Sequence, residues 1–423
     1  MAYTRRIIDD ELDELFPELA AIAIDGAKGV GKTATASERA HTVLNLDDPA
    51  LKATVGADPT ASLSRERPIL FDEWQHVPQV WDAVRRAVDR DREGGQFLFA
   101  DSASPSPGAT AHSGAGRIIR LRMRPMTLQE RGSTAPTVSL SHLLAGNARN
   151  LRGMTELRLR DYVDAIVRSG FPGLQDLSDR AFRIQIDSYI KNIVDRDIPE
   201  LGASVRRSDV LIDWLRAYAA ATSSTASYTQ ILNAATAGFT DKPNRATTAT
   251  YRDLLAQIWV LDPVPAWTAS GSELKRLQSG PKHHLVDPAL AVRLLGMTHE
   301  SLLDGKGAPI GPQEGTLLGS LFESLVTLCV RVPAQTAEAE VRHLRTRNGD
   351  HEIDLILVRP DGGILAFEVK LSATITDSDV RHLHWLRDQI GDRLIDSAVI
   401  NTGPGAYRRS DGVGVIPLGL LGV

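Results

Sequence analysis

Cysteine is nearly absent from this sequence: Cys329 is the single one among 423 residues. One cysteine excludes a disulfide framework within the chain and a cysteine-rich metal site. Cys329 lies inside the apolar stretch 325–330, where a small buried side chain is expected and a catalytic nucleophile is not. Any chemistry must therefore come from other residue types.

Long apolar runs and a strong net charge are also missing. No uninterrupted apolar run reaches 18 residues, and the basic residues near the N-terminus precede acidic ones instead of an apolar signal core. We therefore expect a cytoplasmic protein with no membrane partner. The formal net charge of −5 offers no general attraction for nucleic acid, so any such contact must use a local basic patch.

The composition is otherwise ordinary, with 42% hydrophobic and 24% charged residues, and the length suits two to four domains. Against this background one motif stands out. The apolar run 21–24 leads into Gly-x-x-x-x-Gly-Lys-Thr, and the stretch 34–40 can continue as a helix.

This motif predicts a phosphate-binding loop (P-loop). Its glycines let backbone N–H groups surround phosphate oxygens, while the positive end of the following helix dipole points at them. Lys32 is expected to reach the β- and γ-phosphates of a nucleotide, and the Thr33 hydroxyl is expected to ligate Mg²⁺. The predicted nucleotide-binding residues are Gly26, Ala27, Lys28, Gly29, Val30, Gly31, Lys32, Thr33 and Ala34.

A second apolar strand, 68–71, ends in Asp72 and Glu73. By itself this pair indicates only a turn, but the P-loop about 40 residues upstream favours an ATPase. Asp72 would hold Mg²⁺ through water, and Glu73 would polarise the attacking water. The chain lacks the Asn-Lys-x-Asp element of guanine recognition, so ATP is the expected nucleotide.

Two further strands offer phosphate-sensing candidates. The strand 96–100 ends at Asp101 and Ser102, which would sense the γ-phosphate or simply begin a turn. The strand 116–124 alternates so that Arg120, Arg122 and Arg124 share one face, which is typical of a solvated surface. The other interpretation is that Arg117 or a neighbour neutralises transition-state charge, in cis or across the boundary of a homo-oligomer.

The middle of the chain is predicted to be helical. Residues 154–201 resemble a helical lid. Arg196 within it is expected to join a surface ion-pair cluster, and the other interpretation is a second phosphate-sensing arginine. Helices at 209–221, 227–237 and 247–257, with a hairpin formed by 258–261 and 263–267, suggest a winged helix. The residues near its groove-reading helix are Lys242, Arg245, Thr247, Thr248 and Arg252. This basic set is small, and a packing module that does not bind DNA fits equally well.

The last third carries a possible metal site. A helix at 315–330 bears Glu323, and a predicted hairpin bears Asp354 on its first strand and Glu368 and Lys370 on its second. Asp354 and Glu368 would share Mg²⁺, Lys370 would orient or deprotonate water, and Glu323 would complete the site. Glu-x-Lys alone also fits a solvated hairpin face, and a nuclease scaffold can persist as a binding platform.

Together these motifs resemble a family of prokaryotic AAA-type P-loop ATPases fused to a C-terminal PD-(D/E)xK endonuclease-like domain of unknown function. The similarity runs through residues 26–33, 71–75, 116–128, 169–173, 195–197, 286–288 and 315–323 and the C-terminal carboxylates. It implies an AAA-type fold and ATP binding. One departure is Ala100-Asp101-Ser102, where relatives are expected to carry Thr-Gly-Ser, so γ-phosphate sensing there departs from the family pattern.

We therefore expect an α/β protein with a P-loop ATPase core (1–135), a helical lid (150–202), a winged-helix-like domain (203–268) and a restriction-endonuclease-like α/β domain (281–423). The predicted function is ATP hydrolysis coupled to a metal-dependent nuclease-like domain that acts on nucleic acid. The expected cofactors are ATP and Mg²⁺, and DNA is a better candidate than RNA for the nucleic-acid partner. The alternative is a nucleotide-gated regulatory or antitoxin-like binding protein whose nuclease-like domain is inactive.

Overall fold

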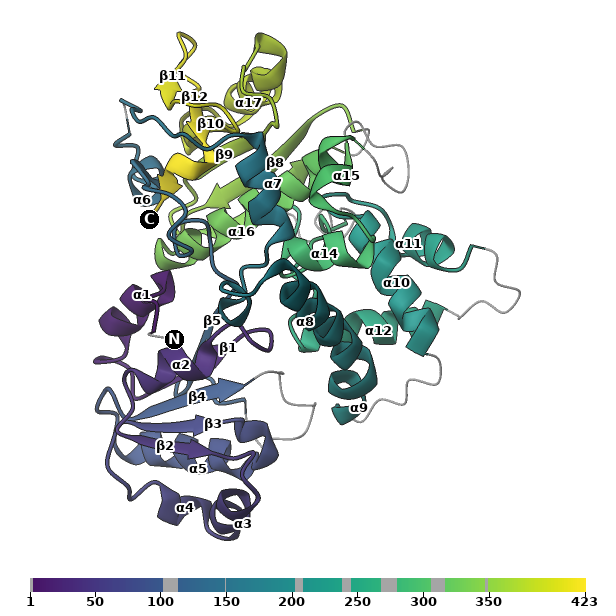
Figure 1. The fold of residues 1–423 in the computed structure, drawn as a ribbon. Helices are drawn as coiled ribbons and strands as arrows, with labels where there is room; N and C mark the ends of the chain where they lie inside the picture. The colour runs from purple at the N-terminus through teal and green to yellow at the C-terminus, as the bar shows by residue number, and fades with distance from the viewer. Residues whose placement is uncertain are drawn as a thin grey trace. The chain divides into compact units, whose positions relative to one another are not determined.

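The computed structural model describes residues 3–101, 113–148, 150–201, 208–237, 245–267, 280–305, 316–346 and 349–423 (Figure 1). They form two compact units. Unit 1 comprises Met1–Met126, Phe171–Gly173 and Leu254–Val260, and unit 2 comprises Thr127–Gly170, Leu174–Asp253 and Leu261–Val423. The finer division into four domains stays a prediction.

Unit 1 is built on a five-stranded sheet in the order β2-β3-β4-β1-β5, in which every neighbouring pair is parallel. Its strands are β1 (Ala21–Asp25), β2 (Thr42–Asn45), β3 (Ile69–Asp72), β4 (Phe97–Asp101) and β5 (Ile119–Arg122). Strand β4 lies between the P-loop strand β1 and the acidic strand β3. The strand that ends at Asp101, a predicted γ-phosphate-sensing residue, is therefore the neighbour of both.

The helices of unit 1 are α1 (Ile7–Leu15), α2 (Lys32–Ser37), α3 (Pro49–Ala57), α4 (Pro59–Ser62) and α5 (Gln79–Arg90). Helix α1 precedes β1, and the other four lie in the connections between strands that a parallel sheet requires. Strands β1, β3 and β4 are buried along their whole length, which explains why the sequence shows them as continuous apolar runs.

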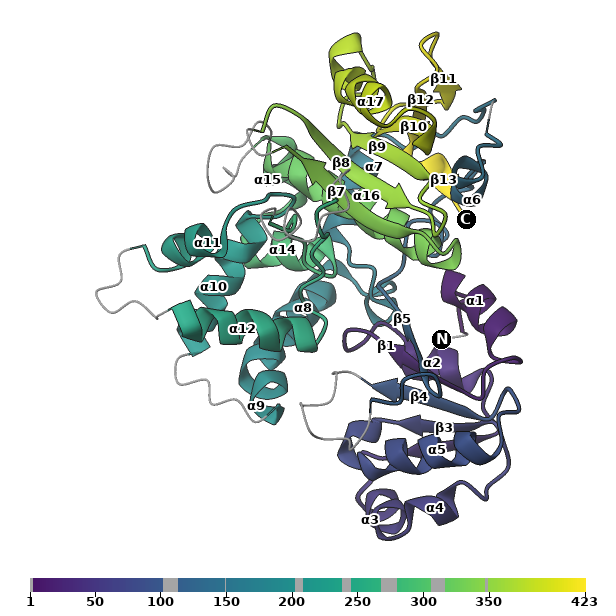
Figure 2. The same ribbon diagram turned by 180° about the vertical axis from the view of Figure 1, so that it is seen from behind.

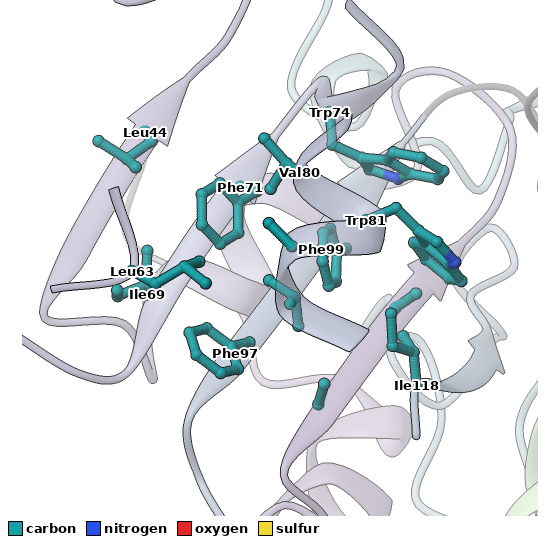
Figure 3. Close-up of a cluster of buried hydrophobic side chains, with 14 of the residues drawn as sticks. Leu44, Leu63, Ile69, Phe71, Trp74, Val80, Trp81, Phe97, Phe99 and Ile118 are labelled. Atoms are coloured by element: carbon teal, nitrogen blue, oxygen red, sulfur yellow. The ribbon is translucent and has the colours of Figure 1, made fainter. Parts of the chain in front are cut away.

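An aromatic core packs between helix α5 and the sheet (Figure 3). Phe71 and Phe99 stack with ring centroids 5.5 Å apart, and Trp74 stacks on Trp81 at 4.7 Å. Trp81 also lies 5.2 Å from the Phe99 ring, so it joins the helix to the strand. The buried residues of α5 include Val80, Trp81, Val84 and Val88, which share one face of the helix.

Removing the Trp81 ring is expected to destabilise unit 1. The side chain is 1% exposed, so Trp81→Ala deletes a buried aromatic group and leaves a cavity that costs about 3–5 kcal/mol. Urea unfolding monitored by circular dichroism measures the loss. The matched control is Arg86→Ala, an exposed residue of the same helix. Equal unfolding midpoints for the two variants would contradict the core role of Trp81.

Unit 2 contains a six-stranded mixed sheet in the order β11-β12-β10-β9-β8-β7 (Figure 2). Its strands are β7 (Glu340–Arg345), β8 (Glu352–Val358), β9 (Ile364–Val369), β10 (Leu394–Asn401), β11 (Tyr407–Arg408) and β12 (Gly414–Pro417). Strands β8 and β9 pair antiparallel, with Leu355 opposite Phe367, which confirms the predicted hairpin. Two short strands, β6 (Val138–Ser139) and β13 (Leu421–Gly422), pair separately.

Two long helices pack on this sheet, α16 (Leu317–Thr336) and α17 (Asp377–Ile390). The other helices are α6 (Leu140–Leu144), α7 (Leu159–Val167), α8 (Asp179–Asn192), α9 (Ile198–Glu200), α10 (Ser208–Ala220), α11 (Tyr228–Ala235), α12 (Arg245–Gln257), α14 (Pro288–Leu294) and α15 (His299–Leu303). Helix α16 is long and apolar enough to cross a membrane, but most of it is buried within the protein, as in a core helix. Cys329 is buried there as predicted, and burial raises the pKa of its thiol to about 11.

The predicted hairpin of 258–261 with 263–267 is wrong. Leu261 instead bridges Leu285, Val264 bridges Lys282 and Ala266 bridges His343. Pro263 and Pro265 lack backbone N–H groups, and the N–H groups of Asp262 and Val264 on the other edge donate to His284 and Lys282 instead. The winged-helix domain stays a prediction.

The residues proposed for the groove-reading helix give little support for DNA contact. Thr248 is buried, and Arg252 pairs with Asp253 at 2.7 Å while its guanidinium covers the Tyr228 ring. Lys242 lies outside the described residues. Arg245 and Thr247 lie in α12, with side chains outside the described part. A packing role agrees better with Thr248 and Arg252.

Candidate nucleotide site and C-terminal carboxylate cluster

The P-loop glycines have the backbone geometry that the motif requires. Gly29 and Gly31 adopt φ angles of +82° and +105°, a left-handed region that is costly for other residues. At Gly26 an added Cβ would lie 2.4 Å from the Met123 carbonyl oxygen, so a larger residue would force the backbone to move. The loop therefore connects β1 to α2 in a conformation that depends on these glycines.

Lys32 is buried at the start of α2. Its Nζ donates hydrogen bonds to the carbonyl oxygens of Gly26 and Ala27, at 2.8 and 2.9 Å, so the ammonium lies within the loop. Burial lowers the pKa of Lys32 to about 8, although the charges of Glu73 and Asp101 oppose that shift. A bound triphosphate would supply the negative charge that restores full protonation.

Thr33 and Asp72, the two residues predicted to hold Mg²⁺ in the ATPase site, lie together. The Thr33 hydroxyl donates a 2.8 Å hydrogen bond to Asp72 Oδ1. Burial raises the pKa of Asp72, and the Thr33 hydrogen bond partly opposes this change. The pair offers a hydroxyl and a carboxylate beside the P-loop, which is the oxygen chemistry that Mg²⁺ prefers.

Glu73 follows Asp72 in an unusual backbone conformation. Its φ of +51° is left-handed, which is uncommon for a residue other than glycine and often marks a functional site. Its Oε2 accepts a 2.5 Å hydrogen bond from Gln75 Nε2, and its charge acts on Lys32. The predicted general base is therefore near the predicted phosphate contact.

The phosphate-sensing candidates at the end of β4 and beside β5 lie in different surroundings. Asp101 is 3% exposed, aligned in register with Asp25, and its charge also acts on Lys32, whereas Ser102 lies outside the described residues. Arg117 pairs with Asp89 at 2.8 Å. Asp25 was not predicted from the sequence. Burial raises its pKa, and its carboxylate pairs with Arg120 at 3.0 Å.

Arg120 and Arg122 are not simply solvated. The Arg120 guanidinium lies 5.0 Å from the centroid of a Trp81 ring, and that of Arg122 lies 3.8 Å from a Trp259 ring. Arg196, in contrast, pairs with Glu200 at 3.0 Å and is largely exposed, which agrees with the predicted surface ion pair.

Two motifs of the family resemblance meet in unit 2. The Asp287 carboxylate accepts hydrogen bonds from the Ser169 hydroxyl at 2.9 Å and the Gly170 backbone N–H at 2.7 Å. It also caps helix α14 through the Ala289 N–H at 2.8 Å. No local pattern indicates this contact, because 117 or 118 residues separate the partners. A structural role accounts for both motifs.

The C-terminal carboxylates also come together. Asp354 Oδ2 accepts a 2.9 Å hydrogen bond from the backbone N–H of Val369, and Lys370 Nζ donates to Glu368 Oε2 at 3.1 Å. Burial is the first cause that raises the pKa of Glu368 well above its usual value, followed by the Asp354 charge. The hairpin thus brings Asp354, Glu368 and Lys370 into one region, as the sequence predicted.

Glu323 is joined to this region by ion pairs of Lys282, a residue that the sequence motifs did not indicate. Lys282 Nζ lies 2.7 Å from Glu323, 2.9 Å from Asp354 and 3.3 Å from Glu352. Over the described part of the chain, no three His, Cys, Asp or Glu side chains are arranged to hold a metal ion. The only local signal was a lysine beside two histidines at the start of an apolar stretch.

Comparison with known proteins divides the chain into three matched parts. Residues 19–131 match the model of a family described as an AAA domain, which confirms that part of the resemblance. Residues 159–301 match a domain of unknown function, DUF8612, and residues 318–421 match another, DUF4143. The endonuclease-like identity of the C-terminal part stays a prediction.

Two mycobacterial proteins are similar over nearly the whole chain. They are the uncharacterized proteins Mb2031c of Mycobacterium bovis and Rv2008c of Mycobacterium tuberculosis, each 24% identical over 426 aligned residues, with 99% of this chain and 84% of the relative covered. Among solved structures, a point mutant of Thermotoga maritima RuvB aligns with a TM-score of 0.26 and 16% identity, over 64% of this chain and 92% of that one. A score this low supports no functional argument. The chain therefore carries an AAA-type ATPase domain in its N-terminal part and a DUF4143 domain at its C-terminal end.

Proposed function

We propose that this protein binds and hydrolyses ATP at the P-loop and that its nucleotide state controls what the C-terminal domain binds. The observation that carries the ATPase proposal is the 2.8 Å hydrogen bond between Thr33 and Asp72 beside the buried Lys32. This arrangement joins the two halves of an ATPase site, which the sequence separates by 39 residues. The AAA domain match supports the same activity.

Each residue has a distinct role in this proposal. The loop N–H groups and Lys32 hold the phosphates, while Thr33 and Asp72 would hold Mg²⁺, which neutralises phosphate charge. Glu73 orients the attacking water and accepts its proton. Phosphate release from ATP by the full chain tests the proposal. We expect Mg²⁺-dependent release that Asp72→Asn abolishes, and equal release by that variant would reject the assignment.

ATP affinity is expected to depend on pH through Lys32. Its pKa of about 8 would rise when triphosphate binds, so binding above pH 8 requires uptake of a proton. Affinity should therefore fall above about pH 8, by up to about tenfold per pH unit. Calorimetry at pH 8.5 with a non-hydrolysable ATP analogue, in two buffers of different ionisation enthalpy, measures the uptake. Identical heats in both buffers would contradict it.

A metal-dependent nuclease acting on DNA or RNA is the second candidate for the C-terminal domain. The observation favouring it is the convergence of Asp354, Glu368 and Lys370. Incubation of the full chain with plasmid, single-stranded DNA and RNA, with Mg²⁺ or Mn²⁺ and with or without ATP, tests this candidate. Cleavage that a folded Asp354→Ala variant lacks would support it, whereas binding without products would favour the nucleotide-gated regulatory alternative.

A further inference from the structure

The C-terminal carboxylate cluster is built around an internal cation. The Lys282 side chain is 0% exposed, and its ammonium forms ion pairs with Glu323 of α16 and with Glu352 and Asp354 of β8. The backbone of Lys282 is fixed as well, because its N–H and carbonyl exchange 2.9 Å hydrogen bonds with Val264. The ammonium is therefore held in place from both ends.

The electrostatics of the cluster agree with a charged lysine. Burial opposes the charge of Lys282, but Asp354 and Glu323 more than offset this and raise its pKa well above the usual value. Burial likewise opposes the charge of Asp354, yet Lys282 and Lys370 lower its pKa. These directions agree with the ion pair that the 2.9 Å distance between Lys282 Nζ and Asp354 Oδ1 shows inside the protein.

Mg²⁺ would have to displace existing hydrogen bonds at most of the carboxylate oxygens named here, although Glu368 Oε1 is buried without a hydrogen-bond partner. Such an ion binds carboxylate oxygens at short range, and here Asp354 uses Oδ1 for Lys282 and Oδ2 for the Val369 N–H. Glu323 Oε1 also accepts from Lys282, and Glu368 Oε2 accepts from Lys370. A divalent ion between these carboxylates would lie within a few ångströms of an ammonium group, where like charges repel.

We infer that the Lys282 ammonium takes the place of a divalent ion between Glu323 and Asp354, so that this cluster is a metal-free structural hub. It joins the segment 280–287 to helix α16 and strand β8, which are distant in sequence. The cluster then supplies no metal-activated water. This inference does not depend on ATP hydrolysis in unit 1.

Binding of Mn²⁺ alone, measured by electron paramagnetic resonance, tests the inference. The full chain is used with Asp72→Asn, which removes the ATPase-site carboxylate, and is compared with the same protein carrying Asp354→Asn. We expect no Mn²⁺ site that depends on Asp354 and has a Kd below about 1 mM. A Kd of about 1 mM marks the weak end of protein sites for divalent ions. An Asp354-dependent site in the protein that retains Lys282 would overturn the inference.

Replacement of Lys282 provides a second readout. Lys282→Met leaves buried carboxylates without their cation, so we expect a melting temperature lowered by several degrees or, at worst, failure to fold. Lys191→Met, which changes an exposed lysine of α8, is the control and should melt with the wild type. Unchanged melting of Lys282→Met would contradict the hub. The Mn²⁺ comparison retains Lys282 and remains decisive even if this variant does not fold.

Discussion

Glu73→Gln is expected to bind ATP normally and to hydrolyse it about 100- to 10,000-fold more slowly, the range that general bases contribute. Glutamine has nearly the same shape and can still bond to Gln75, but its amide cannot accept a proton from water. The expected loss corresponds to about 2.7–5.4 kcal/mol of transition-state stabilisation. Single-turnover phosphate release measures the rate, and a fluorescent ATP analogue measures binding.

The control for this experiment is Glu66→Gln, which removes an exposed carboxylate that precedes strand β3. It should retain both binding and turnover. Wild-type turnover by Glu73→Gln would show that Glu73 is not the base. Asp101 would then be the next candidate, because after Glu73 its charge does most to raise the pKa of Lys32. Loss of binding would instead mean that Glu73 shapes the loop.

Much of unit 1, and the β8–β9 hairpin of unit 2, could be predicted because the sequence patterns that indicate them are local. Glycine at positions 29 and 31 reflects positive φ angles that other residues rarely adopt, and the apolar runs of β1, β3 and β4 reflect burial on both faces of a parallel sheet. The β8–β9 hairpin followed from two apolar strands flanking a Pro-Asp-Gly-Gly turn. Each of these features depends on neighbours in sequence.

The features that were missed depend on distant partners. Lys282 meets Glu323 and Asp354 across 41 and 72 residues, and no spacing rule connects a single lysine to carboxylates so far away. The predicted hairpin at 258–267 was wrong for a related reason. Its two short apolar stretches suggested a strand pair, but the choice of pairing partner is a tertiary property. A motif with the right residues can thus be correctly located and still have a different chemical environment.

Lys32→Ala is expected to abolish detectable ATP hydrolysis and to weaken ATP binding severely. The variant removes the ammonium that lies within the P-loop, and each preorganised donor at a reacting phosphate contributes about 100- to 1,000-fold to the rate. It also removes two hydrogen bonds to the Gly26 and Ala27 carbonyls, so the loop itself should become less ordered. Equilibrium binding of a fluorescent ATP analogue and steady-state phosphate release measure the two effects.

Lys52→Ala is the matched control, because Lys52 is an exposed lysine of helix α3 in the same unit. It should bind and hydrolyse ATP like the wild type. Comparing Lys32→Ala with Glu73→Gln separates binding from chemistry, since the first should lose both and the second only turnover. If Lys32→Ala retained wild-type affinity, the ammonium would serve only to order the loop through Gly26 and Ala27, and the assignment of Lys32 to the phosphates would be wrong.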